Sequence, residues 1–162
     1  MYPLEYWMDL ALKEAGIAAQ KQEVPIGAVI VLNGEIISSA HNLKESNTQA
    51  IAHAEILAIE AACRKLGRWR LNDCTLLVTL EPCLMCAGAI IQSRIGKVVY
   101  GCTDAKAGAV TSLYQTLSDT RLNHRPEVIG GIREAVCSSL LSNFFSKLRK
   151  PVIVPTESAK SL

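Results

Sequence analysis

Hydrophobic positions recur at intervals of three and four in the N-terminal segment, which is the spacing of an amphipathic helix. This pattern predicts a helix over residues 4–22. The next two apolar runs, residues 25–32 and 35–40, are rich in β-forming residues and are joined by Asn33-Gly34. Because this dipeptide suits a tight type I′ turn, the two runs predict a β-hairpin.

Helical and strand-like patterns alternate through the rest of the chain. A polar loop leads into a helical pattern over residues 50–66 that stops at Gly67, a residue that often ends helices. The later elements are expected in this order: strand 74–80, helix 86–94, strand 97–102, a short helix around 111–117, strand 128–132 and a last helix through 140–149. This order predicts an α/β fold with a mixed central sheet of about five strands, covered on both faces in a three-layer α/β/α arrangement.

The length and composition suit one domain with a sizeable core, since the chain has 162 residues and 49% of them are hydrophobic. We expect residues 1–150 to form this domain, and residues 151–162, which have two prolines and no periodicity, to form a flexible tail. Acidic residues interrupt the N-terminal apolar pattern, and the longest apolar run is far too short to cross a bilayer. The sequence therefore predicts a soluble, cytoplasmic protein with no membrane attachment.

Two of the six cysteines form a close pair after a proline. Cysteines of an intracellular protein are expected to be reduced, so such a pair indicates metal binding or redox chemistry. Pro82 suits the first turn of a helix, on which Cys83 and Cys86 would share one face where the helix dipole favours thiolates. The pair alone fits either a zinc site or a thioredoxin-like site. The remaining cysteines are separated from one another and are expected in the core: Cys63, Cys74, Cys102 and Cys137.

The sequence "HAE" offers a third ligand for a metal. His53 and Glu55 would lie about 200° apart on a regular helix, so both reach one target only from the helix end. This predicts a helix that begins close to His53 and meets the N-terminus of the helix carrying Cys83 and Cys86. Three protein ligands leave one tetrahedral position of a zinc ion open for water, as in catalytic sites. Glu55 would then take up and transfer protons.

The combination of H-x-E with P-C-x-x-C is the signature of zinc deaminases. Further segments extend the match over residues 4–149: "VPIGAVIV", "HN", "HAEI", "TLEPCLMCAGAIIQSRI", "VVYGCTDAKAGA", "LNHRPEV" and "LLSNFFSKLR". In these segments the chain resembles the bacterial tRNA-specific adenosine deaminases, which belong to the cytidine-deaminase-like superfamily. One departure is Ala50-Ile51, where family members commonly have proline-threonine.

The resemblance implies hydrolytic conversion of the wobble adenosine of a tRNA anticodon to inosine. Zinc-bound hydroxide would attack C6 of adenine, and Glu55 would carry the proton to the ring and to the departing amine. The implied cofactor is one Zn²⁺ per chain, with no organic cofactor. The implied partners are the anticodon stem-loop of tRNA and a second copy of the chain in a homodimer.

The resemblance also suggests which residues bind the substrate. Asn42 would hold the base, Ile26 and Ala54 would line its pocket, and Asp104 would lie near the substrate sugar. From the residues alone, Asn42 could instead cap its loop and Asp104 could shape a turn.

Charge adds a candidate RNA surface. The net charge is only +2, but seven basic and three acidic residues follow from Arg121 onward. Apolar residues at helical spacing in the last helix are expected to pack mostly on the core: Leu140, Leu141, Phe144, Phe145 and Leu148. Lys147, Arg149 and Lys150 would then face outward and contact RNA, although an ordinary solvated helix would show the same pattern.

Two other functions fit the same motif. One is a zinc-dependent deaminase of a free nucleobase or nucleoside of the cytidine or guanine type. The other is a zinc-stabilised binding module in which Glu55 has no catalytic role. A fourth protein ligand would favour the module, and His41 and His124 are the only other histidines.

Overall fold

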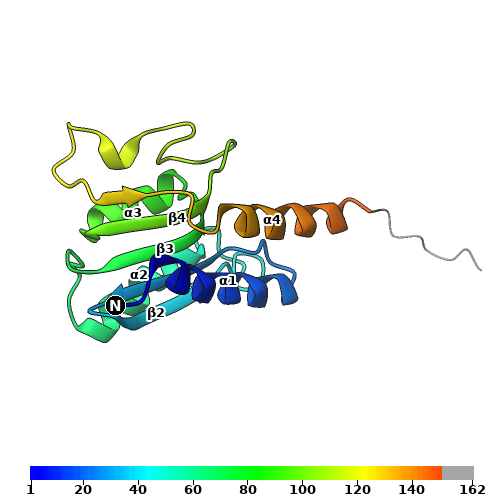
Figure 1. The fold of residues 1–162 in the computed structure, drawn as a ribbon, viewed down its shortest axis with the longest axis horizontal. Helices are drawn as coiled ribbons and strands as arrows, with labels where there is room; N and C mark the ends of the chain where they lie inside the picture. Colours follow the sequence, from blue (N-terminus) through cyan, green and yellow to red (C-terminus); the bar gives the residue numbers. More distant parts are fainter. Residues whose placement is uncertain (151–162) are drawn as a thin grey trace, which may run out of the picture.

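The computed structural model describes residues 1–150, which form a five-stranded sheet between two helical layers (Figure 1). The elements in chain order are α1 (Leu4–Gln20), β1 (Gly27–Leu32), β2 (Glu35–His41), α2 (Ala54–Leu66), β3 (Thr75–Leu80), α3 (Leu84–Gln92), β4 (Lys97–Cys102), the 3-10 helix η1 (Thr116–Ser118), β5 (Glu127–Ile129) and α4 (Glu134–Leu148). The expected tail at residues 151–162 lies outside the described residues. In residues 1–150 no helix combines the length and the apolar character needed to cross a membrane.

The sheet is mixed, as predicted, with the strand order β2-β1-β3-β4-β5. Strand β1 is antiparallel to both β2 and β3, whereas β3, β4 and β5 are parallel to one another. The hairpin turn has positive φ at both Asn33 (51°) and Gly34 (77°), which a type I′ turn requires. The predicted hairpin and the three-layer α/β fold are both confirmed.

Each face of the sheet is buried under its own pair of helices. Alternate strand residues, including Ile30, Leu76 and Val98, pack with α2 and α3 in one apolar cluster. Their chain neighbours Val29 and Leu77 pack with α1 and α4 in another cluster on the opposite face. Burial on both faces explains why the three central strands β1, β3 and β4 are almost continuously hydrophobic in sequence.

The starts of α2 and α3 determine where the chemistry-bearing residues lie. Helix α2 begins at Ala54 with His53 in the N-cap position, and it ends at Gly67 in the left-handed conformation (φ 65°), both as predicted. Helix α3 begins at Leu84, two residues before the expected helix 86–94 and two residues after Pro82, which suits a first helical turn but precedes the helix here, with Cys83 as the N-cap. The Pro82 carbonyl accepts a hydrogen bond from the Ala109 N–H at 2.8 Å, which ties Pro82 to the loop after β4.

The C-terminal elements differ from the sequence prediction in length and packing. Strand β5 stops at Ile129, before Gly131, whose φ is 86°. Helix α4 begins earlier than expected and projects beyond the edge of the sheet (Figure 1). Of the apolar residues expected to pack mostly on the core, Leu140, Leu141 and Phe144 are half-buried, whereas Phe145 and Leu148 are 42% and 64% exposed. They lie on the part of the helix that has passed the sheet.

Candidate active site

Three metal-ligand side chains meet where the N-termini of α2 and α3 come together. His53 and Cys83 are the N-cap residues of the two helices, and Cys86 lies in the first turn of α3. The His53 Nδ1 atom is 3.7 Å from the Cys83 Sγ and 3.6 Å from the Cys86 Sγ. All three ligand atoms lie within 4.8 Å of one another. The predicted meeting of the two helix N-termini is therefore confirmed.

The spacing of these atoms fits a tetrahedral zinc ion. Bond lengths of about 2.0–2.1 Å to nitrogen and about 2.3 Å to sulfur place tetrahedral N and S ligands about 3.6 Å apart. Thiolates combined with imidazole are also a ligand set that zinc prefers. Within residues 1–150 the cluster has three members, which matches a catalytic zinc site better than a closed structural one.

The two other histidines are engaged elsewhere. His41 Nδ1 lies 2.7 Å from Glu14 Oε2, and its Nε2 lies 3.0 Å from the Lys21 ammonium. His124 donates from Nε2 to the Ile95 carbonyl at 2.7 Å. Neither histidine belongs to the cluster, so the fourth protein ligand that would favour a binding module is not found among the described residues.

The protonation of the cysteines also suits metal binding. A hydrogen bond with Cys86 lowers the pKa of Cys83 to about 4, against the effect of burial, and a bond with His53 adds to this lowering. The same bond with Cys83, together with burial, raises the pKa of Cys86. The two sulfurs thus share one proton, and a divalent cation would take its place and hold both as thiolates.

Glu55 lies in the first turn of α2, next to the three-residue cluster. It is 4% exposed, and its Oε2 has no hydrogen-bond partner among the described residues. Burial raises the pKa of this carboxyl from 4.5 to about 7, while the charge on His53 opposes the change. A carboxylate with this pKa is suited to exchange protons near neutral pH.

The residues proposed to contact the base are placed around the start of β1 and α2. Asn42 is buried, and its Oδ1 accepts the Lys44 N–H at 3.1 Å while its Nδ2 donates to the Val24 carbonyl at 3.4 Å. Asn42 therefore does cap its loop, and its part in binding a base stays a prediction. Ala54 is fully buried and Ile26 is half-buried.

A groove of about 720 Å³ lies between α4 and the loop that follows β4. Its lining includes Ile26, Asp104 and Arg149, which the sequence placed at the substrate or at RNA, and it also includes Phe145. The Asp104 Oδ1 accepts the N–H groups of Lys106 and Ala107, so this residue shapes its turn as well as lining the groove. The metal-ligand cluster itself does not line the groove.

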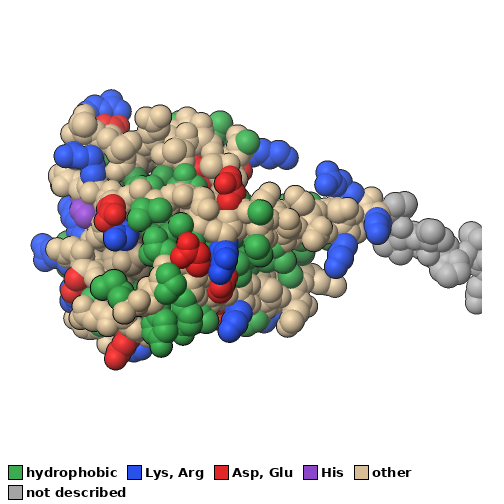
Figure 2. Space-filling model, in the orientation of Figure 1, with side chains coloured by type: hydrophobic (Ala, Val, Ile, Leu, Met, Phe, Trp, Pro, Cys, Tyr) green, Lys and Arg blue, Asp and Glu red, His purple; other side chains and the backbone are tan. Residues whose placement is uncertain are grey.

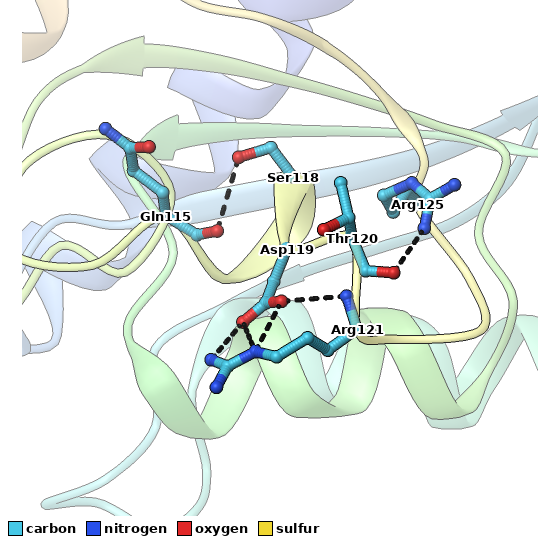
Figure 3. Close-up of polar contacts among 6 residues, drawn as sticks. All are labelled: Gln115, Ser118, Asp119, Thr120, Arg121 and Arg125. Carbon is cyan, nitrogen blue, oxygen red and sulfur yellow. Dashed lines mark hydrogen bonds and ion pairs between the residues drawn. The ribbon is translucent and has the colours of Figure 1, made fainter.

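The basic residues of the C-terminal quarter divide into two groups. Lys147, Arg149 and Lys150 are exposed, and Figure 2 shows Lys and Arg side chains gathered on the projecting end of α4. By contrast, Arg121 pairs with Asp119, and Arg125 donates to the Thr120 carbonyl, inside the loop around η1 (Figure 3). The residues on α4 are therefore the better candidates for contacts with RNA phosphates.

Two buried carboxylates near the site were not singled out from the sequence. Glu23 is 1% exposed and accepts the N–H groups of Glu45 and Ser46, in the loop that leads to His53. Glu81 is 2% exposed and accepts hydrogen bonds from the loop after β4. Burial would raise the pKa of Glu81, but these hydrogen bonds outweigh it and lower the pKa to about 2. The available sequence signal was an acidic residue one or two positions before a proline inside each apolar motif, "EVP" and "LEPC".

Comparison with known proteins shows the family of this chain. The family model of the MafB19-like deaminases matches residues 4–149. A tRNA-specific adenosine deaminase from Bacillus subtilis is 54% identical over 146 residues, which is 90% of this chain and 91% of that protein. One from Streptococcus pyogenes serotype M1 is 51% identical over 152 residues, covering 92% of this chain and 89% of that protein.

A solved structure gives the same answer at the level of the fold. It comes from a study of A-to-I editing by tRNA:A34 deaminases at the wobble position of transfer RNA. It superposes with a TM-score of 0.81 at 44% identity, covering 84% of this chain and 99% of that one. The chain belongs to the MafB19-like deaminases and, among them, to the family of the bacterial tRNA-specific adenosine deaminases.

Proposed function

We propose that this protein converts the wobble adenosine of a tRNA anticodon to inosine by hydrolytic deamination. The observation that carries the proposal is the cluster of His53, Cys83 and Cys86 beside the buried Glu55, in a chain 54% identical to a tRNA-specific adenosine deaminase. We further propose that residues 1–150 form a single zinc deaminase domain, a proposal supported by the family model that matches residues 4–149.

His53, Cys83 and Cys86 would hold one zinc ion per chain through one imidazole nitrogen and two thiolates. When bound, zinc supplies a Lewis acid that lowers the pKa of a coordinated water from about 16 to about 7. The N-termini of α2 and α3 favour the negative charge of the thiolates. Glu55 Oε2 would take up a proton from the attacking water and deliver it to the adenine ring, and would then carry the second proton of that water to the departing amine, so adenosine and water give inosine and ammonia.

The groove beside α4 supports a nucleic acid as the substrate. It combines apolar side chains, among them Phe145, with the exposed cation of Arg149. Single-stranded RNA loops bind such surfaces by stacking bases on aromatic rings and by pairing phosphates with cations. We therefore place the anticodon loop along this groove, with Asn42, Ile26 and Ala54 around the base and Asp104 near its sugar. A tRNA substrate also favours a cytoplasmic location.

A homodimer is proposed because apolar side chains are exposed on segments that meet at the metal-ligand cluster. The exposed residues are Ile51, Leu84, Leu113 and Tyr114, each more than 50% exposed. Leu84 and Leu113 belong to segments that lie together. The backbone of Cys83, the residue before Leu84, forms a β-bridge with Gly108, and the Gly108 carbonyl accepts the Leu113 N–H. Exposed apolar residues gathered in this way commonly mark a protein interface.

The direct test is an assay of the zinc-loaded protein on an anticodon stem-loop with a wobble adenosine and, separately, on free adenosine, cytidine and guanine. We expect inosine to form in the stem-loop far faster than any free compound is deaminated. Deamination of a free base or nucleoside with no reaction on the stem-loop would support the small-molecule alternative instead.

Neutralising the basic end of α4 is expected to weaken RNA binding. With Lys147, Arg149 and Lys150 replaced by Gln, the slope of log affinity against log salt should become shallower by about 0.7–0.9 for each ion pair with a phosphate that the substitutions remove. Because the three side chains are exposed, the melting temperature should change little. Binding of a fluorescent stem-loop at several salt concentrations measures the affinity and the slope.

A matched control replaces three exposed cations away from the groove, Lys13, Arg64 and Arg70, by Gln. This control should keep the salt slope of the wild type. Equal affinities and slopes for the α4 variant and the wild type would show that RNA is held elsewhere.

A further inference from the structure

We propose that Glu81 is a positioning residue that holds the loop of residues 103–112 against the start of α3 and thereby sets the shape of the groove for RNA. The part of this inference that concerns RNA rests on the function proposed above. Glu81 itself has no place in the metal-ligand set or in the transfer of protons, and it acts only through the loop.

The buried carboxylate of Glu81 accepts five hydrogen bonds from this loop. Its Oε1 accepts the N–H groups of Val110, Thr111 and Ser112 at 3.1, 2.6 and 2.8 Å. Its Oε2 accepts the N–H of Asp104 at 2.9 Å and the hydroxyl of Ser112. A carboxylate can accept about four such bonds, so the capacity of this side chain is fully used. Both ends of the loop are thus bound to the same side chain.

The backbone around Glu81 strengthens this arrangement. The Pro82 carbonyl accepts the Ala109 N–H at 2.8 Å, and Cys83 forms a bridge with Gly108. A Cβ atom on Gly108 would lie only 2.3 Å from Glu81 Oε2, so glycine is needed for the loop to approach the carboxylate. The loop therefore wraps closely around the segment that ends in the N-cap of α3.

The bound loop also forms one wall of the groove. Thr103, Asp104 and Lys106 line the groove, opposite residues of α4 such as Phe145. The Asp104 N–H is the point at which Oε2 holds this wall, and the Asp104 carbonyl in turn accepts the Gly108 N–H at 2.8 Å. A change at Glu81 is thus expected to move the wall without changing any group that lines the groove.

Glu81→Gln tests this arrangement selectively. The amide oxygen of glutamine can replace Oε1 and keep three backbone donors, but its NH₂ group then faces the Asp104 N–H and cannot accept it. The Ser112 hydroxyl can rotate and accept from the NH₂ group. The substitution therefore removes the hydrogen bond by which Glu81 holds the groove wall at Asp104.

We expect Glu81→Gln to accelerate hydrogen exchange at the Asp104 amide by about tenfold or more, with smaller changes at residues 110–112. Affinity for an anticodon stem-loop should fall by about tenfold or more, whereas the single-turnover rate at saturating RNA should change by less than about threefold. Zinc content should equal that of the wild type. Exchange is followed residue by residue by NMR, and the stem-loop with a wobble adenosine is the probe.

Two further variants separate positioning from general stability. Ser112→Ala removes the hydroxyl that donates to Glu81. It should accelerate hydrogen exchange at the Asp104 amide and lower the affinity for the stem-loop, both by less than Glu81→Gln does. Val98→Ala removes buried volume near the opposite end of β4 and should lower the melting temperature while leaving affinity unchanged. Protection of the Asp104 amide as in the wild type, or a loss of affinity no larger than that of Val98→Ala, would overturn the proposal. If the wild type binds no stem-loop, the proposed function fails, and the exchange data alone decide whether Glu81 holds the loop.

Discussion

Replacing Cys83 by serine is expected to remove most of the bound zinc and to lower inosine formation by more than about a hundredfold. Replacing a residue that only hydrogen-bonds to a metal ligand commonly lowers metal affinity or activity by about 10–100-fold. Here a ligand itself is removed. The pKa of Cys83 is lowered to about 4, so this side chain offers a thiolate at neutral pH, which the serine hydroxyl cannot do. His53→Ala should have the same effect, because it removes the nitrogen ligand. Metal content by mass spectrometry and the rate of inosine formation measure the outcome.

The matched control for this prediction is Cys63→Ser. Cys63 is half-buried on α2, and its thiol contacts the Trp69 carbonyl rather than the metal-ligand cluster. This variant should keep one zinc ion per chain and wild-type activity. Chelation should inactivate the wild type, and added zinc should restore it. Full zinc occupancy with full activity in both the Cys83 and the His53 variant would exclude the proposed ligand set.

The metal-ligand cluster was predictable because each part of it depends on local geometry. The spacing of Cys83 and Cys86 places both thiols at the start of one helix. The angle between His53 and Glu55 on a helix requires that both act from the helix end, and His53 is indeed the N-cap of α2. These are constraints within a few residues, which a sequence expresses directly.

The role of Glu81 was not predictable from the sequence, since its partners lie 23 to 31 residues further along the chain. Only the parallel pairing of β3 with β4 brings the loop after β4 back to the end of β3. The place of Pro82 outside α3 was not predictable for the same reason, because its carbonyl accepts a hydrogen bond from Ala109 of that loop. Helix periodicity likewise gives the face of α4 that is apolar but not the point where the sheet beneath it ends. Because the sheet ends beneath the middle of α4, Cys137 is buried while Leu148 is exposed.

Glu55→Gln is expected to keep one zinc ion per chain and to lose turnover by about 10²–10⁴-fold, the usual contribution of a general acid–base residue. The variant preserves the shape of the side chain but cannot take up a proton. Glu55 is not part of the three-residue cluster, so metal binding should persist. Single-turnover inosine formation at saturating RNA measures the loss, and zinc content with RNA affinity serves as the control. Near-normal turnover would end the assignment of Glu55 as the proton carrier.

The same substitution should change stability with a definite dependence on pH. Burial raises the pKa of Glu55 from 4.5 to about 7 in the folded chain, so the folded state holds this proton more tightly than the unfolded state. The contribution of Glu55 to the stability of the zinc-free wild type is therefore complete below pH 4.5, falls as the pH rises from 4.5 to about 7, and is lost above that range. The glutamine side chain has no charge to desolvate, so the melting temperature of the zinc-free variant should rise relative to that of the wild type across this range. A melting temperature that rises while turnover collapses identifies a residue retained for chemistry at the expense of folding, whereas a parallel loss of both would mean that Glu55 serves the structure.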